Sequence, residues 1–157
     1  MHWQSDMSPS QERRWLISCW EAFLPIDWSC STLGIAEVVS VLVRRKNAGR
    51  LSAASFSQAI VQLGHEIIQK RSIVKVEPTN ALVISALNQI QKHSINATDA
   101  VVLHAALGLA NYLRSIGNDL VLFASDQRLL RAAQVEGLAT FNPETQDQSA
   151  LAVLVGP

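Results

Sequence analysis

Residues 120–137, LVLFASDQRLLRAAQVEG, contain an apolar strand, a short polar turn and a helix that ends at a glycine. The strand predicted for residues 120–124 is apolar on both faces, which is typical of a strand buried inside a parallel sheet. Asp126 stands between this strand and the helix predicted for residues 127–136. Ligands bind at the carboxyl ends of strands in open parallel sheets, so Asp126 is either a functional acid or a plain helix N-cap.

Short strands alternate with helices along most of the chain. Besides residues 120–124, we predict strands at residues 26–31, 72–76 and 138–142. The predicted helices cover residues 9–24, 33–47, 52–68, 79–93, 96–116 and 127–136. This alternation predicts one α/β domain with a parallel sheet and right-handed crossovers. We expect residues 1–8 to be loose and residues 145–157 to form a C-terminal tail of this domain, which spans residues 1–157.

The composition excludes several classes of protein. Hydrophobic residues make up 48% of the 157 residues and charged residues 17%, which excludes a disordered chain. Thirteen Lys and Arg balance 13 Asp and Glu, so any nucleic-acid site has to be a local patch. No apolar run reaches the ~18 residues of a membrane span, and the N-terminus lacks a signal-peptide pattern. Two cysteines fit a reducing cytoplasm, where we expect this protein, and no spacing indicates a zinc site.

Two further acidic residues occur in apolar surroundings. Glu37 is the only charged residue within residues 33–43, and burial of an unpaired carboxylate costs several kcal/mol. The alternative is that Glu37 belongs to a thin solvated stripe on one face of an otherwise buried helix. Asp99 opens the helix of residues 96–116, where Asn96 and Asp99 have the spacing of a capping box. Spacing alone leaves both the functional and the structural interpretations open.

Three motifs stand in a fixed order along the chain: STLGIAEV (31–38), ATDA (97–100) and FASDQRLLRAA (123–133). EGL (136–138) and FNP (141–143) follow them. In this order they resemble the motifs of PIN-domain proteins, and in particular those of the ribonuclease toxins of type II toxin–antitoxin pairs. The resemblance extends from about Asp27 to Glu144. It implies a PIN-like three-layer α/β/α fold around a parallel sheet.

The resemblance also implies an activity, the hydrolysis of RNA by an endoribonuclease that depends on Mg²⁺ or Mn²⁺. The family's acids map onto Glu37, Asp99 and Asp126 as catalytic residues and metal ligands, with Ser125 and Thr98 in support. Hard divalent cations prefer such carboxylate oxygens, and a metal-bound water is a nucleophile toward a phosphodiester. The implied partners are an RNA substrate and a protein antitoxin, and we also expect a homodimer.

One element of the family pattern is missing, namely a first, central strand that ends in an aspartate. Residues 1–8 are polar and contain only Asp6, and Asp27 is at most a substitute. We therefore expect the strands of the first half of the chain to lack a direct partner in the second half. Exposed strand edges favour association, so weak metal binding and aggregation or dimerisation are expected, and an upstream extension should restore both fold and activity. The alternative function is a catalytically weakened or truncated PIN-like module that binds protein or RNA.

Four arginines are candidate contacts for RNA or a partner. Arg128 and Arg131 flank Asp126 and suit phosphates or partner carboxylates. Arg44 and Arg45 belong to a local basic cluster that either contacts RNA phosphates or is simply the solvated cationic end of a helix.

Overall fold

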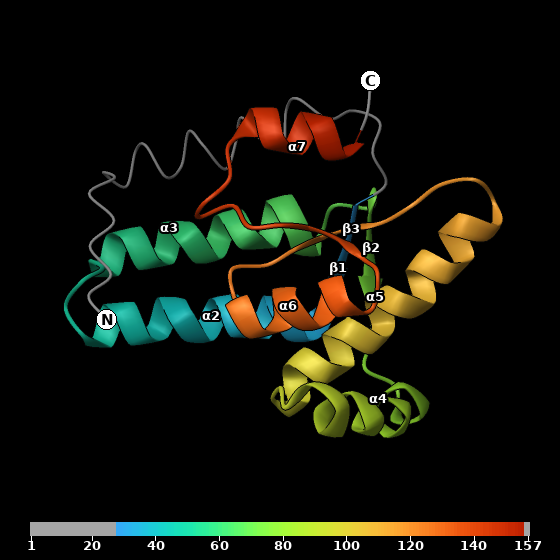
Figure 1. The fold of residues 1–157 in the computed structure, drawn as a ribbon. Coiled ribbons are helices and arrows are strands. Elements are labelled where there is room, and N and C mark those ends of the chain that lie inside the picture. Colours follow the sequence, from blue (N-terminus) through green and yellow to red (C-terminus); the bar gives the residue numbers. More distant parts are fainter. Residues whose placement is uncertain (1–27, 156–157) are drawn as a thin grey trace.

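A computed structural model describes residues 28–155 of the chain (Figure 1). Residues 1–8 and the predicted helix 9–24 lie outside the described residues. The elements are β1 (Trp28–Ser31), α2 (Thr32–Asn47), α3 (Ala53–Leu63), the π-helical turn η1 (Gly64–Ile68), β2 (Ile73–Val76), α4 (Asn80–His93), α5 (Ala97–Ser115), β3 (Val121–Phe123), α6 (Gln127–Val135), β4 (Ala139–Phe141) and α7 (Gln148–Val155). This order confirms the α/β class.

The strands form two separate two-stranded parallel sheets. In the first sheet β1 pairs with β2, with Trp28 opposite Ile73. In the second sheet β3 pairs with β4, with Phe123 opposite Phe141. Within residues 28–155 no strand ladder joins the two sheets, in agreement with the expectation that the strands of the first half of the chain lack a direct partner in the second half. Aromatic side chains meet instead, because the ring of Trp28 lies 5.3 Å from that of Phe123, centroid to centroid.

The helix ends lie where the local sequence places them. The side chains of Ser31, Thr79 and Asn96 each accept a hydrogen bond from a backbone N–H of the helix that follows. These bonds satisfy donors that the first turn of a helix leaves without a partner. Gly117 and Gly137 follow α5 and α6 with φ of +82° and +80°, a conformation that glycine adopts without steric cost. Capping and termination signals are local, so this part of the fold follows from the sequence.

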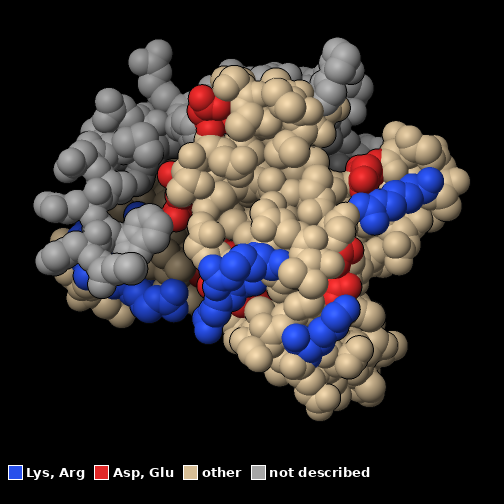
Figure 2. All heavy atoms as spheres, in the orientation of Figure 1, with Lys and Arg blue, Asp and Glu red and all other residues tan. Residues whose placement is uncertain are grey.

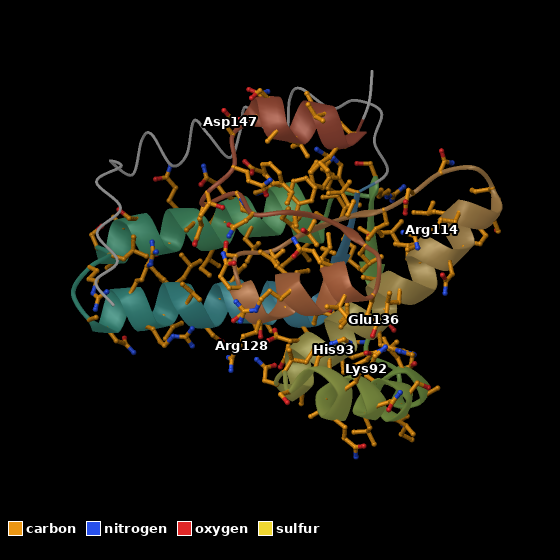
Figure 3. All side chains as sticks on the ribbon, in the orientation of Figure 1. Lys92, His93, Arg114, Arg128, Glu136 and Asp147 are labelled. Carbon is orange, nitrogen blue, oxygen red and sulfur yellow. The ribbon has the colours of Figure 1, made fainter. Side chains whose placement is uncertain are left out.

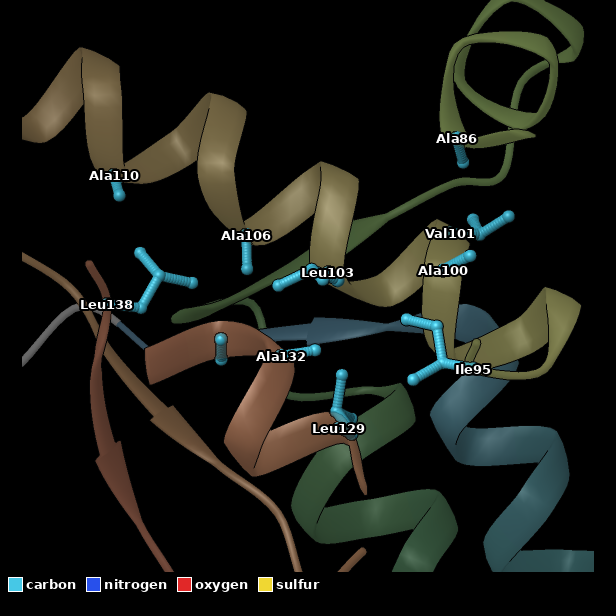
Figure 4. Close-up of a cluster of buried hydrophobic side chains, with 11 residues drawn as sticks. Ala86, Ile95, Ala100, Val101, Leu103, Ala106, Ala110, Leu129, Ala132 and Leu138 are labelled. Carbon is cyan, nitrogen blue, oxygen red and sulfur yellow. The ribbon is translucent and has the colours of Figure 1, made fainter. Parts of the chain in front are cut away.

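The hydrophobic core lies around α5, which packs against α4 and α6 (Figure 4). Leu103, at the middle of α5, has an exposed fraction of 0%. Several core positions are alanines, such as Ala100 and Ala133, and their small side chains let the helices approach closely. The second half of the chain therefore provides most of the buried apolar surface.

The prediction that residues 33–43 form a buried helix is wrong with respect to burial. These residues are helical as part of α2, but no residue of α2 is buried, and Val38 is 47% exposed. The physical reason is that α2 packs mainly against α3, beside a sheet of only two strands (Figure 1). Few described side chains are therefore available to cover its apolar positions.

Two further elements differ in detail from the prediction. The single helix expected at residues 52–68 is an α-helix, α3, followed by the π-helical turn η1. The segment expected to be a C-terminal tail contains α7, whose Leu151 is 1% exposed. Asp147 precedes α7 and accepts a hydrogen bond of 3.0 Å from the backbone N–H of Ala150, so a capping residue stabilises the start of this helix.

Candidate metal-dependent nuclease site

Three elements bring the predicted acids within electrostatic reach of one another. Asp99 lies in the first turn of α5, Asp126 is the N-cap of α6, and Glu37 lies on α2. The pKa of Asp99 is raised above its ordinary value, first because the carboxyl is buried and then because Asp126 and Glu37 carry the same charge. The positive charge of Arg128 acts in the opposite direction. The structure thus gathers three acids that are far apart in the sequence.

Asp99 combines the capping role with membership of this cluster. Its backbone N–H donates to Asn96 Oδ1 over 2.8 Å, and Asn96 Nδ2 donates to Asp99 Oδ2 over 2.7 Å. The pair has the spacing of a capping box, but Asp99 accepts from the side-chain amide of Asn96 and not from its backbone N–H. Within the described residues the other carboxylate oxygen, Oδ1, accepts no hydrogen bond.

Asp126 is arranged in the same way. Its Oδ1 accepts hydrogen bonds from the backbone N–H groups of Arg128, over 2.7 Å, and Leu129, over 3.1 Å. Arg128 Nε lies 4.0 Å from the same oxygen. In the part of the chain that the structure describes, Oδ2 accepts no hydrogen bond. Each aspartate therefore uses one oxygen to start a helix and keeps the other for further contacts.

Glu37 is exposed, in agreement with the interpretation as a solvated helix face. Its charge still acts on Asp99, so exposure does not remove it from the acidic group. Across residues 28–155, no three His, Cys, Asp or Glu side chains lie close enough together to hold one metal ion in this structure. The three acids influence one another without forming a closed set of ligands.

The predicted supporting residues have less defined surroundings. Thr98 is half-buried and Ser125 is exposed, and neither hydroxyl makes a hydrogen bond within residues 28–155. Arg131 is exposed and forms no ion pair with any described residue. Their roles stay predictions. Arg128 is the predicted cation that the structure places beside the acids, through both Asp126 and Asp99.

A second charged cluster, which the sequence analysis missed, joins α4 to the end of α6 (Figure 3). Glu136 Oε1 lies 2.7 Å from Lys92 Nζ and 2.5 Å from His93 Nε2. Hydrogen bonds from Lys92 and His93 lower the pKa of Glu136. The only signal in the sequence was the presence of Lys92 and His93 in the last turn of a helix. Their position does not reveal that Glu136, 43 residues after His93, is their partner.

We expect Glu136→Gln to destabilise the fold by about 1–2 kcal/mol at neutral pH, because charge-assisted hydrogen bonds are lost at a partly solvated site. A lowered folded-state pKa means that the carboxylate stabilises the fold above its unfolded-state pKa. This contribution disappears as the pH falls through the folded-state pKa. Urea unfolding at a series of pH values should therefore show a difference between wild type and variant that shrinks under acidic conditions.

Glu144→Gln is the matched control for this experiment. Glu144 is exposed, and its carboxylate accepts no hydrogen bond within the described residues. The control should change the free energy of unfolding little at any pH. An equal effect of both substitutions would contradict the role assigned to Glu136.

The comparisons with known proteins add no family assignment. No family model matches this chain, and a comparison with curated proteins gives no match. Within residues 28–155, none of the helices is both long and apolar enough to cross a membrane.

Proposed function

We propose that this protein is a divalent-metal-dependent endoribonuclease with a PIN-like three-layer fold, and that it acts in the cytoplasm as the toxin of a type II toxin–antitoxin pair. The observation that carries the proposal is the buried carboxylate of Asp99, whose pKa is raised first by this burial and then by the charges of Asp126 and Glu37. The order of the motifs that hold these three acids supports it as well. The proposal includes an RNA substrate, a protein antitoxin and a homodimer.

The donor set fits a hard divalent cation. Asp99 and Asp126 each keep one carboxylate oxygen without a hydrogen bond among the described residues, and Mg²⁺ commonly takes one or two carboxylates together with water. These two aspartates would hold Mg²⁺ or Mn²⁺, which supplies an activated water and stabilises charge on the phosphate. Glu37 would orient that water by hydrogen bonding. Arg128, beside Asp126, would hold the RNA phosphate in position.

A second candidate function is a PIN-like module that binds RNA or protein without cleaving it. Two observations favour it. The described part of the chain has two sheets that no strand connects, and its acids do not form a closed ligand group. An incubation of the purified protein with RNA and either Mg²⁺ or Mn²⁺ separates the two candidates. Binding without cleavage supports the module.

The decisive variant is Asp126→Asn, which removes the charge and keeps the helix cap, because asparagine is as good an N-cap as aspartate. We expect RNA cleavage with Mn²⁺ to fall by at least about 10–100-fold, the loss typical even of a residue that only supports a metal ligand. Asp147→Asn is the matched control, since Asp147 also starts a helix and lies far from Arg128 in the fold (Figure 3). Equal cleavage by wild type and Asp126→Asn would contradict the proposed site.

A further inference from the structure

A hollow of about 320 Å³ lies at the C-terminal end of α2 and in the turn that follows. The described residues that line it are Val41, Arg44, Arg45, Ala48 and Arg50. Its described lining thus combines two apolar residues with three arginines. A concave site with several cations is a natural receptor for an anion that carries more than one acceptor oxygen.

Among residues 28–155, no acidic side chain forms an ion pair with the arginines of this hollow. The sequence contains no Asp or Glu between residues 38 and 65, although the chain as a whole has equal numbers of acids and bases. Arg44, Arg45 and Arg50 form no ion pair with any described residue. Lys46, which follows Arg45, has its Nζ 4.7 Å from the centroid of the Phe56 ring. Figure 2 shows Lys and Arg side chains at this end of the molecule, where α2 turns into α3. The three arginines are therefore a local excess of positive charge.

Three of the residues that line the hollow lie on the same face of α2 as Glu37. Glu37, Val41, Arg44 and Ala48 are spaced by four, three and four residues, which places them along one side of a helix. At 1.5 Å per residue, Arg44 lies about 10 Å along the helix axis from Glu37. A strand of duplex DNA advances about 3.4 Å per nucleotide along its axis. With the same rise for a stacked RNA strand, this separation corresponds to about three nucleotides.

We propose that this arginine hollow, made by Arg44, Arg45 and Arg50, binds a backbone phosphate of single-stranded RNA about three nucleotides from the phosphate at the acidic site. The inference rests on the proposed function, because it takes RNA as the ligand of the acids. It adds a second phosphate contact, which holds the RNA strand along the axis of α2. Contacts to phosphate carry no information on base sequence, so the hollow would contribute affinity and register but no base preference.

Fluorescence anisotropy with a labelled single-stranded RNA of ten nucleotides, in EDTA and at several salt concentrations, tests the hollow without any need for cleavage. Each phosphate contact contributes about −0.7 to the slope of log K against log salt for a single strand. The triple variant Arg44→Gln, Arg45→Gln, Arg50→Gln removes the single phosphate contact of the hollow and should therefore reduce the slope by about 0.7. Arg44→Gln alone should weaken RNA binding and reduce the slope by no more than this amount.

Arg71→Gln is the matched control, because Arg71 is exposed, forms no ion pair within the described residues and lies outside the hollow. It removes the same charge as Arg44→Gln and should leave the slope unchanged. Thermal unfolding establishes that all variants are folded. An RNA of three nucleotides is too short to reach both sites, so the arginine variants should bind it with a smaller deficit than the longer RNA.

The outcomes separate this inference from the proposed function. If wild type cleaves RNA but the triple variant keeps the full salt slope, the phosphate site is overturned and the nuclease proposal stands. If the slope falls as expected and wild type cleaves nothing, the phosphate site is supported and the nuclease proposal fails. If the variants lose affinity for polyglutamate and none for RNA, the hollow receives an acidic protein segment and the RNA assignment is overturned.

Discussion

Asp99→Asn is expected to abolish metal-dependent RNA cleavage and, at the same time, to make the metal-free protein more stable at neutral pH. Both effects follow from the position of Asp99, which is 7% exposed and faces the charges of Asp126 and Glu37. Removal of the charge removes a ligand oxygen of the proposed site. It also relieves the burial penalty and the repulsion that raise the pKa of this carboxyl.

The sign of the stability effect follows from linkage. Because the folded-state pKa of Asp99 is raised, the folded protein binds the proton more tightly than the unfolded chain does. The ionised carboxylate therefore destabilises the fold once the pH exceeds the folded-state pKa, and it has no such effect below the unfolded-state pKa. The substituted amide keeps an oxygen that accepts from Asn96 Nδ2, so the cap of α5 is preserved.

Thermal unfolding in EDTA and in Mn²⁺ measures both consequences. The free energy of unfolding of the wild type should increase by about 2.7 kcal/mol when the Mn²⁺ concentration reaches 100 times the dissociation constant. Asp99→Asn should start from a higher midpoint in EDTA and should not respond to Mn²⁺. A lower midpoint in EDTA would show that the carboxylate acts only as a structural cap.

Asp119→Asn is a control for which we expect a change in stability of the opposite sign. Hydrogen bonds from the backbone N–H of Leu120 and from Arg114 lower the pKa of Asp119, so its charge favours the folded state. Neutralisation of Asp119 should lower the midpoint slightly and should leave the response to Mn²⁺ unchanged. The pair of variants thus distinguishes a repelled carboxylate from a stabilised one.

Leu103→Ala is expected to destabilise the fold by about 2–5 kcal/mol, because it opens a cavity where α5 contacts its neighbours. Leu103 has an exposed fraction of 0% and lies inside the main hydrophobic cluster (Figure 4). Denaturant unfolding followed by circular dichroism gives the free-energy difference. A loss of this size would be a large share of the stability of a domain of this length.

Leu87→Ala is the matched control for the core. Leu87 lies on α4 with 53% of its surface exposed, so the same atoms are removed from a largely solvated position. We expect a loss of less than about 1 kcal/mol, because little apolar surface returns to water. Similar losses for the two variants would show that the hydrophobic core does not lie around α5.

The sequence predicted the starts and ends of helices well, because the residues that cap or end a helix lie next to it in the chain. The helix starts at Thr79 and Asn96 were predicted from capping residues, and the structure confirms them. The ends at Gly117 and Gly137 follow from glycine's freedom to take positive φ. These features depend on a few neighbouring residues, so the local sequence contains the necessary information.

Other features were missed because they depend on contacts between distant segments. The apolar pattern of α2 resembled that of a buried helix, yet burial depends on which elements cover it. The contact of Glu136 with Lys92 and His93 needs α4 and α6 to pack together, and no residue spacing reports that.

The sequence by itself determined the α/β order of elements, the limits of most helices and the identity of three acids. These properties follow from backbone preferences, hydrophobic periodicity and the ordered motifs. Only the tertiary structure decided in which register the described strands pair and that burial, together with the charges of Asp126 and Glu37, raises the pKa of Asp99. Strand pairing and the interaction of charges depend on distances in space, which packing sets among segments far apart in the chain.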